Sequence, residues 1–255
     1  MISGLIPVQA AEKTKITAQF AISIAGFPVG RGNVVAEIKG RNYSIDATAK
    51  TTGIAGLFVD SRGRAVSKGR YYRTEIRPSS YALSAKEDDI YNVVQIALNS
   101  GTVSKSSASP PLLKAADRVP MHRKYMRRIV DPLSMLLQPV ARNKPRTGET
   151  ACNRTFKIFD GRQRYNIKLY YKRKTNIRAN RSSAYSGPAT VCGATFDFIA
   201  GHRPGLKRTR FMENNKDLEV WYVPVADKQL LAVYKIQVGT MVGRLVLKSI
   251  AFSIQ

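Results

Sequence analysis

The strongest constraint on the fold is an alternation of apolar and polar side chains near the start of the chain. Between Ile16 and Ile24 every second residue is apolar, and the residues between them are polar or small. A period of two is typical of a β-strand that buries one face, because successive side chains of a strand point to opposite faces. Glycine and proline then interrupt the pattern from Gly26 to Gly32, which predicts a turn into a second strand.

Similar runs of β-type sequence recur along most of the chain. They are Asn33–Lys39, Tyr43–Lys50, Tyr71–Ile76, Ile90–Leu98, Thr155–Phe159, Tyr165–Lys172, Ala189–Phe198, Leu218–Val223, Leu230–Gln237 and Leu245–Ile254. Turn signals separate several of these runs at the intervals of an antiparallel meander. We therefore predict an all-β fold, an antiparallel sheet of about a dozen strands with one or two short helices.

The clearest helix signal starts at Asp131 and Pro132, since Asp can cap a helix and Pro suits its first position. Leu133, Leu136 and Leu137 would then form one apolar face. A short turn over residues 54–58 is a second candidate helix.

Two loop-like stretches divide the runs into two groups. They are Ser100–Pro111 and Arg142–Gly148, and they predict a hinge within residues 100–148 between an amino-terminal and a carboxy-terminal sheet. We expect a single β-rich domain over residues 11–255. No stretch approaches the roughly 18 consecutive apolar residues of a spanning helix, so no transmembrane segment is expected.

The amino terminus indicates export. Residues 1–8 are apolar and uncharged, and Val8-Gln9-Ala10 places small residues where a signal peptidase cleaves. We interpret residues 1–10 as the remnant of a secretory signal, although the segment is short and has no positively charged start. The alternative is an apolar terminus without a targeting role.

The two cysteines, Cys152 and Cys192, lie 40 residues apart, and neither belongs to a C-x-x-C pair. In an exported protein the pair predicts a structural disulfide, because the compartment is oxidising. In a cytosolic protein two unrelated buried thiols would be the better interpretation. The export-like terminus favours the disulfide.

Six motifs, in this order, carry a resemblance to a known family. They are Ile24–Gly30, Asp131–Ser134, Phe159–Tyr165, Tyr185–Cys192, Ile199–Gly201 and Val220–Pro224. The set resembles an exported proteobacterial family catalogued as domain of unknown function 3108, over nearly the whole chain from about residue 15. The resemblance implies an open, coiled antiparallel sheet in the manner of β-spirals and lipoprotein carriers. That family has no assigned activity, so it implies no catalytic residue.

The search for catalytic and cofactor motifs gives none. The chain has no nucleophile elbow, phosphate-binding loop or zinc-protease motif, and Gly30-Arg31-Gly32 lies in a hairpin context unlike that of a dinucleotide site. His122 and His202 both stand in basic surroundings, so we interpret them as solvated surface residues and not as metal ligands. We expect no enzyme activity, cofactor or metal.

The charge is the most informative functional feature. The net charge is +25, and residues 142–181 carry thirteen basic and two acidic residues, whereas residues 1–60 carry six and four. Alternation would place Arg162 and Arg164 on one strand face, where guanidinium groups can hold an anion. The candidate anion-binding residues are Arg162, Arg164, Tyr165, Lys168, Lys172 and Arg173. Salt bridges or a solvated face are the structural alternative for them.

These observations predict a non-enzymatic periplasmic protein that acts as a binding or scaffold module. Its expected partner is an anionic envelope component (lipid, lipopolysaccharide or peptidoglycan) or an envelope protein, and export argues against nucleic acid. The alternative is a carrier of lipid or lipoprotein, in which the curved sheet and the helix at Leu133 enclose an apolar groove. A third class, an enzyme acting on wall polymers, would need converging titratable groups.

Overall fold

The computed structural model describes residues 13–52, 61–179, 184–226 and 228–255. Within them, fourteen strands form one open antiparallel sheet, which confirms the all-β fold. The first seven are β1 (Lys13–Ile24), β2 (Phe27–Lys39), β3 (Asn42–Thr51), β4 (Ser61–Tyr71), β5 (Ile76–Glu87), β6 (Ile90–Asn99) and β7 (Thr102–Ser109). The others are β8 (Leu137–Pro139), β9 (Arg154–Phe159), β10 (Arg164–Ile177), β11 (Gly187–Ala200), β12 (Leu218–Pro224), β13 (Leu230–Thr240) and β14 (Gly243–Ile254).

Helix is scarce in the described residues. They contain one α-helix, α2 (Lys207–Glu213), and three 3₁₀ turns, Arg123–Met126, Ser134–Leu136 and Glu149–Ala151. The predicted signal remnant at residues 1–10 and the predicted short helix at residues 54–58 lie outside the described residues.

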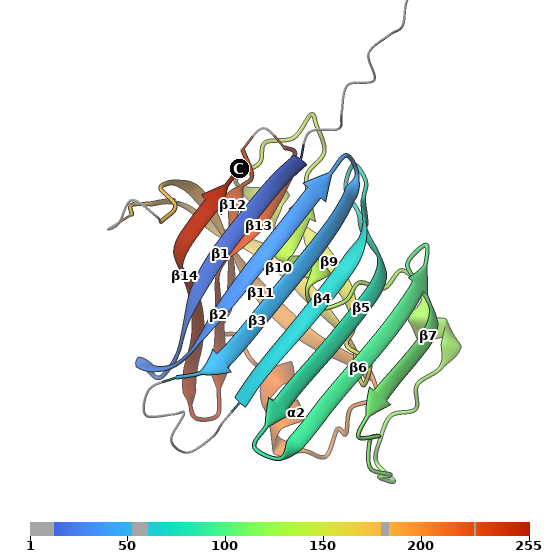
Figure 1. Ribbon diagram of the computed structural model, residues 1–255. Coiled ribbons are helices and arrows are strands. Elements are labelled where there is room, and N and C mark those ends of the chain that lie inside the picture. Colours follow the sequence, from blue (N-terminus) through green and yellow to red (C-terminus); the bar gives the residue numbers. More distant parts are fainter. Residues whose placement is uncertain (1–12, 53–60, 180–183, 227) are drawn as a thin grey trace, which may run out of the picture.

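The strands are ordered β7-β6-β5-β4-β3-β2-β1-β14-β13-β12-β11-β10-β9, and β8 pairs with β13. Two meanders of consecutive hairpins therefore meet at the pairing of β1 with β14. The sheet coils so that β1 to β7 form one layer in front of the carboxy-terminal strands (Figure 1). The two halves belong to one continuous sheet, so they are not the separate sheets that the sequence predicted on either side of residues 100–148.

The two edges of the sheet are held near each other by the segment between them. Val130 forms an isolated bridge with Ile158 of the edge strand β9. One residue earlier, the amide of Ile129 donates to the carbonyl of Gly101, in the β6–β7 turn, at 2.8 Å. Val94, Ile96 and neighbouring apolar residues, including Ile129, form a small buried cluster where the two edges approach each other. A larger buried cluster occupies much of the space between the layers.

Three predicted elements differ from the structure. Tyr71–Ile76 is not a strand, because β4 ends at Tyr71 and a turn leads into β5 at Ile76. Ser100–Pro111 is not only a loop, because it contains the edge strand β7. The predicted helix after Asp131 is a single 3₁₀ turn, and Leu137 already belongs to β8.

The segment of residues 131–136, here called the Asp131 turn, is fixed by a buried polar network. The Asp131 carboxylate accepts the amides of Leu133 at 2.9 Å and Ser134 at 3.0 Å, as a capping Asp would. It also accepts the hydroxyl of Ser67 on β4 at 2.8 Å and that of Ser134. Tyr43 on β3 bonds Ser134 at 2.7 Å. Side chains of two strands thus hold this turn in the space between the layers.

Candidate functional site

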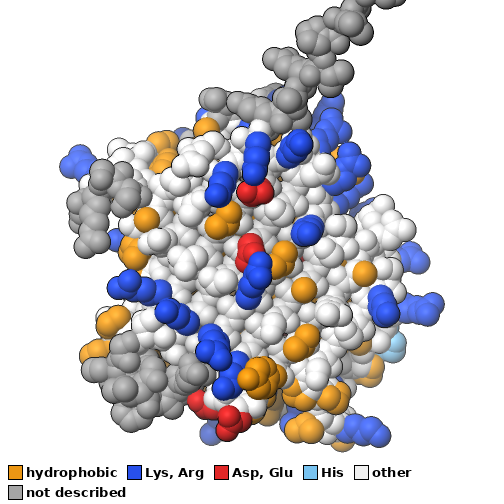
Figure 2. Space-filling view, viewed as in Figure 1, with side chains coloured by type: hydrophobic (Ala, Val, Ile, Leu, Met, Phe, Trp, Pro, Cys, Tyr) orange, Lys and Arg blue, Asp and Glu red, His pale blue; other side chains and the backbone are white. Residues whose placement is uncertain are grey.

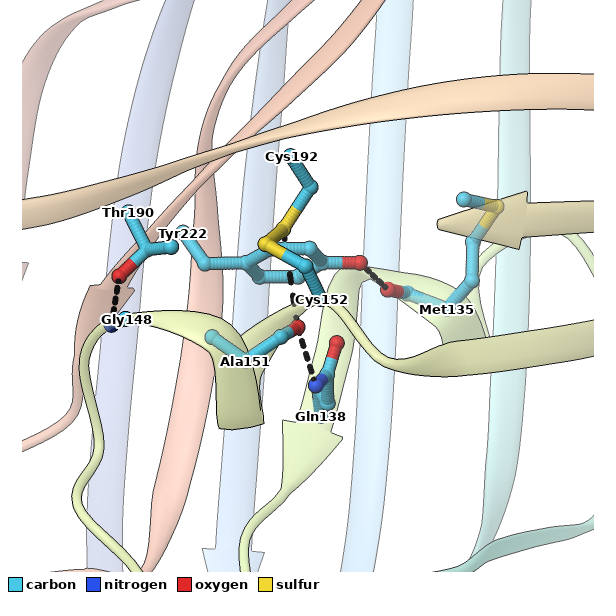
Figure 3. The surroundings of a disulfide bond; sticks show 8 residues. All are labelled: Met135, Gln138, Gly148, Ala151, Cys152, Thr190, Cys192 and Tyr222. Atoms are coloured by element: carbon cyan, nitrogen blue, oxygen red, sulfur yellow. Dashed lines mark hydrogen bonds between the residues drawn. A yellow bond between two sulfur atoms is a disulfide. The ribbon is translucent and has the colours of Figure 1, made fainter. Parts of the chain in front are cut away.

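The structure joins Cys152 and Cys192 by a disulfide, in agreement with the interpretation from the sequence. Both residues are fully buried, and their Cα atoms are 5.3 Å apart. The buried ring of Tyr222 lies beside the bond, and its hydroxyl donates to the carbonyl of Met135 at 3.2 Å (Figure 3). The disulfide therefore lies on one side of the Asp131 turn, within the main core.

Arg162 holds the two edges of the sheet together. It precedes β10, in a turn where Asp160 accepts the amides of Arg162 and Gln163 at 2.8 and 2.7 Å. Its guanidinium donates to the carbonyls of Ser109, the last residue of the other edge strand β7, at 3.1 Å and of Pro110, directly after it, at 2.7 Å. The prediction that Arg162 shares a strand face with Arg164 is wrong, because β10 begins only at Arg164.

Arg164 and Tyr165 are also used within the fold. Arg164 is 5% exposed, and its guanidinium donates to the carbonyls of Tyr125 at 3.2 Å and Tyr165 at 2.5 Å. Burial lowers the pKa of Arg164 and raises the pKa of Tyr165. The Tyr165 ring stacks on Phe196 with ring centroids 4.5 Å apart. Substitution of Arg164 or Tyr165 would therefore disturb the fold, and it could not serve as a test of ligand binding.

The other three candidates lie further along β10. Lys168 is exposed, whereas Lys172 and Arg173 both bond the Glu219 carboxylate, at 2.8 and 3.3 Å. Lys172 and Arg173 are consecutive in sequence, and they can reach the same carboxylate because the strand register shifts between Tyr171 and Arg173. Burial alone would raise the pKa of Glu219, but hydrogen bonds from Lys172, Trp221 and Arg173 lower it to about 2.

The six candidate residues therefore do not form one cluster. Arg162, Arg164 and Tyr165 stabilise the fold, and Lys172 and Arg173 are ion-paired. An anion-binding role for this region stays a prediction, with Lys168 as an exposed member that forms no ion pair with a described carboxylate.

The two histidines lie in different environments. His122 is exposed, as expected. His202 is 6% exposed and its ring stacks on Phe198 with centroids 5.1 Å apart, so its interpretation as a surface residue is wrong. In the part of the chain that the structure describes, no group of three or more His, Cys, Asp or Glu residues could hold a metal ion.

A cavity of about 510 Å³ lies on the other side of the Asp131 turn, and none of the six candidate residues lines it. The inner faces of β1 to β5 form one wall, and Pro132, Leu133 and Leu136 form the second. Val233 and Ile236 of β13 and Leu247 of β14 line the third. The lining is predominantly apolar, which suits an apolar ligand of small to moderate size.

The cavity exists because the inward residues at one end of the front layer are small. The register aligns Gly32, Ala49, Gly63 and Ala85 across β2, β3, β4 and β5, and all four line the cavity. The next inward row is Val34, Ala47, Ala65 and Leu83. Further along the same strands the inward positions carry larger side chains such as Ile45 and Tyr81, which are buried in the core. Side-chain size thus decides where the space between the layers is filled.

Basic residues border this apolar space. Lys50, Arg62 and Arg64 are exposed, and they also line the cavity. The arrangement offers an apolar interior with cationic groups at its margin. It can hold an apolar chain and leave an anionic end near the cations.

Taken together, the fold and the site define a class of protein: an open, coiled antiparallel sheet with one internal disulfide and an apolar cavity between its layers. The chain belongs to the family described as Protein of unknown function (DUF3108), whose model matches residues 19–248. This match confirms the resemblance noted in the sequence. No curated protein and no solved structure matches the chain.

No helix among the described residues combines the length and apolarity needed to cross a membrane.

Proposed function

We propose that this protein is a non-enzymatic carrier or binding module for an apolar ligand that bears an acyl chain, and that it acts in the bacterial envelope. The observation that carries the proposal is the cavity of about 510 Å³, within the roughly 300–1,000 Å³ of typical ligand sites. Its walls come from three separate parts of the chain, and their lining is predominantly apolar. An apolar cavity is a poor site for water and a good one for hydrocarbon.

The small inward residues support this function further. Larger side chains at these positions would fill the space and gain buried apolar area, as they do elsewhere between the layers. A row of Gly and Ala at the cavity wall is therefore costly for stability and favourable for a ligand. The Asp131 turn adds a rigid opposite wall, because its polar network fixes Leu133 and Leu136 in place.

The test is to fill the cavity from the row of small residues. Ala49→Leu/Ala85→Leu should weaken binding of the fluorescent fatty acid cis-parinaric acid about tenfold or more, equivalent to about 1.4 kcal/mol. Ala82→Leu is the matched control, because Ala82 lies on β5 with its side chain on the opposite, exposed face. Fluorescence titration measures both. If the filled variant binds as tightly as the unaltered protein, the cavity is not the ligand site.

The proposed location is the periplasm. A buried disulfide supports it, since such bonds persist mainly in oxidising compartments. Cell fractionation combined with alkylation of free thiols tests the location. Recovery in the cytoplasmic fraction with both thiols free would contradict it.

A second candidate function is a scaffold that adheres to an anionic wall component through β10. Lys168 and Lys174 are exposed on that strand, which supports this role. Changing the two to Gln should lower co-sedimentation with peptidoglycan sacculi at low salt, and the effect should shrink as salt rises. Unchanged co-sedimentation would remove the support for this candidate.

A further inference from the structure

Four cations form a row across the outer face of the front layer. The register places Arg31 of β2 opposite Lys50 of β3, Lys50 opposite Arg62 of β4, and Arg62 opposite Lys86 of β5. Figure 2 shows a diagonal run of Lys and Arg side chains across the lower part of this face, with hydrophobic side chains near each end. Three strand spacings make the row roughly 15 Å long.

Three like-charged pairs follow one another along the row. The single like-charged pairs elsewhere on this layer, Lys13 opposite Lys39 and Arg70 opposite Arg77, each include a cation that is ion-paired. Like charges directly opposite each other on neighbouring strands are destabilising. Elsewhere on this layer Arg64 pairs with Asp46, Arg77 with Glu75 at 2.8 Å, and Lys13 with Glu37 at 3.0 Å. None of the four cations of the row forms an ion pair with a carboxylate of the described residues. An anionic partner outside the molecule would offset this repulsion.

Exposed apolar side chains lie at the same end of the molecule. Phe27 is 73% exposed at the start of β2, directly after the β1–β2 turn, and Met241 and Val242 are 60% and 75% exposed in the β13–β14 turn. The two turns are neighbours, because the amide of Ala25 donates to the carbonyl of Arg244 at 3.0 Å. Exposed apolar side chains next to a row of cations are typical of surfaces that bind the interface of an anionic bilayer.

The row also lies along the margin of the cavity. Lys50 and Arg62 belong to the row and line the cavity, since each is next in sequence to a small residue that faces inward. Arg31 itself does not line the cavity, but its two neighbours in sequence, Gly30 and Gly32, do. A surface that met this row would therefore face one border of the apolar space.

We propose that the row Arg31, Lys50, Arg62 and Lys86, together with the tips at Phe27, Met241 and Val242, docks the protein on a bilayer that contains anionic phospholipid. The cations contact the headgroups, and the apolar tips enter the interface beside them. The docking needs no ligand in the cavity. It extends the proposed carrier function by naming the surface with which lipid would be exchanged.

The β5–β6 turn sets the orientation of the docked molecule. It carries Asp88 and Asp89, and with Glu87 at the end of β5 it places three carboxylates next to the Lys86 end of the row. An anionic surface repels these carboxylates, so the Arg31 end, beside Phe27, makes the closest approach.

The experiment is co-sedimentation with vesicles of phosphatidylcholine alone or mixed with phosphatidylglycerol. The unaltered protein should bind the mixed vesicles and bind them less at high salt. The variant Arg31→Gln/Lys50→Gln/Arg62→Gln/Lys86→Gln should bind them about six-hundredfold more weakly, because each of the four cations near such a surface contributes about fivefold. Phe27→Ala/Met241→Ala/Val242→Ala should weaken the part of the binding that persists at high salt.

The matched control neutralises four cations elsewhere on the same layer. It is Lys39→Gln/Lys68→Gln/Arg70→Gln/Lys105→Gln, which changes the net charge equally and should retain most of the binding. Equal losses in both variants would show that net charge alone attracts the protein, and would overturn the proposal. Binding of the row to a soluble linear polyanion such as heparin, without binding to the vesicles, would assign the row to a polysaccharide and also overturn it.

Failure of docking and failure of the carrier function give different results. Arg31 and Lys86 are the two row positions that do not line the cavity. Arg31→Gln/Lys86→Gln should weaken binding to the mixed vesicles about twenty-five-fold and still bind cis-parinaric acid in solution, whereas Ala49→Leu/Ala85→Leu should still bind the mixed vesicles. Circular dichroism confirms that each variant is folded. A row variant that keeps its vesicle binding contradicts the docking proposal and leaves the carrier proposal intact.

Discussion

The two sides of the Asp131 turn are built from the same sheet and differ in how they are filled. On one side Tyr222 and the Cys152–Cys192 disulfide are fully buried, and the Tyr222 hydroxyl bonds the turn at Met135. On the other side Leu133 and Leu136 of the same turn border a cavity of about 510 Å³. The difference shows that the coil of the sheet does not by itself create a cavity. The choice of small inward residues on β2 to β5 creates it.

The two sides of the Asp131 turn therefore contribute to different properties of the protein. The filled side supplies stability through close packing and a covalent cross-link. The open side gives up packing and offers a place for a ligand. Changes on the filled side should therefore lower the free energy of unfolding, and changes on the open side should mainly alter ligand binding.

The largest effect should come from the disulfide. The bond closes a separation of 40 residues, so Cys152→Ser/Cys192→Ser should lower the free energy of unfolding by about 4 kcal/mol on the chain-entropy model. Urea denaturation followed by circular dichroism measures the loss. The variant should keep its β-type spectrum and its affinity for cis-parinaric acid under native conditions. A fall in affinity as large as the fall in stability would show that the two sides act as one unit.

Leucines on the two sides should respond differently to truncation. Leu231 on β13 is fully buried, so Leu231→Ala should cost about 3 kcal/mol. Leu136 borders the cavity and is only partly buried, so Leu136→Ala should cost about 1 kcal/mol. Thermal unfolding of both variants tests the contrast. Equal costs would mean that the cavity side is packed as tightly as the other.

Asp131 connects the two sides, and its loss should affect both. Asp131→Ala removes the acceptor of two amides and two hydroxyls, which should cost about 2 kcal/mol and weaken fatty-acid binding as the cavity wall loosens. Asn keeps one acceptor oxygen for the amides, so Asp131→Asn should retain most of the binding. Burial also raises the pKa of Asp131, so the neutral amide removes the cost of burying a charge. If Asp131→Ala binds normally, the network does not hold the wall.

The smallest effect should be the pH dependence of Glu219 on β12. Its pKa is lowered from 4.5 to about 2, so its ion pairs stabilise the folded protein above the unfolded-state pKa. That contribution is lost as the pH falls from about 4.5 toward about 2. Glu219→Gln should therefore be less stable than the unaltered protein at neutral pH, and the gap should close in acid. A gap that persists at low pH would show that packing, and not charge, is responsible.

Much of the fold could be predicted from the sequence, because apolar alternation marks strands that bury one face. Ile16–Ile24 and Leu245–Ile254 are examples, and both runs lie within strands of the structure. The strand β4 was missed for a physical reason. Its inward positions include Gly63, Ala65 and Ser67, so the alternation is between small and basic residues and gives no apolar signal. The edge strand β7 was missed because most of its residues are polar on both faces.

The site was harder to predict, because it depends on register. The disulfide could be inferred from two cysteines, but the cation row comes from four strands, and only their pairing aligns Arg31 with Lys86. Arg162 and Arg164 were misplaced because the strand starts one residue after the turn that Asp160 fixes. Two signals in the sequence point to the cavity. The apolar residues Leu133 and Leu136 after Asp131 indicate one wall, and the concentration of Gly and Ala at alternate positions of β2, β3 and β4 indicates the other.

The pairing of β1 with β14 has a consequence for how the chain reaches its native state. The first and last strands of the described sheet lie at its centre, where Ile16 faces Ile254, whereas the edges come from the middle of the chain. Each meander can form from neighbours in sequence, but the central seam joins residues more than two hundred positions apart. Closing so long a loop is entropically costly and slow, so the seam should be the last part to form. Until the final strand arrives, two half-sheets would each expose an unpaired central edge, which is the surface most exposed to aggregation during folding.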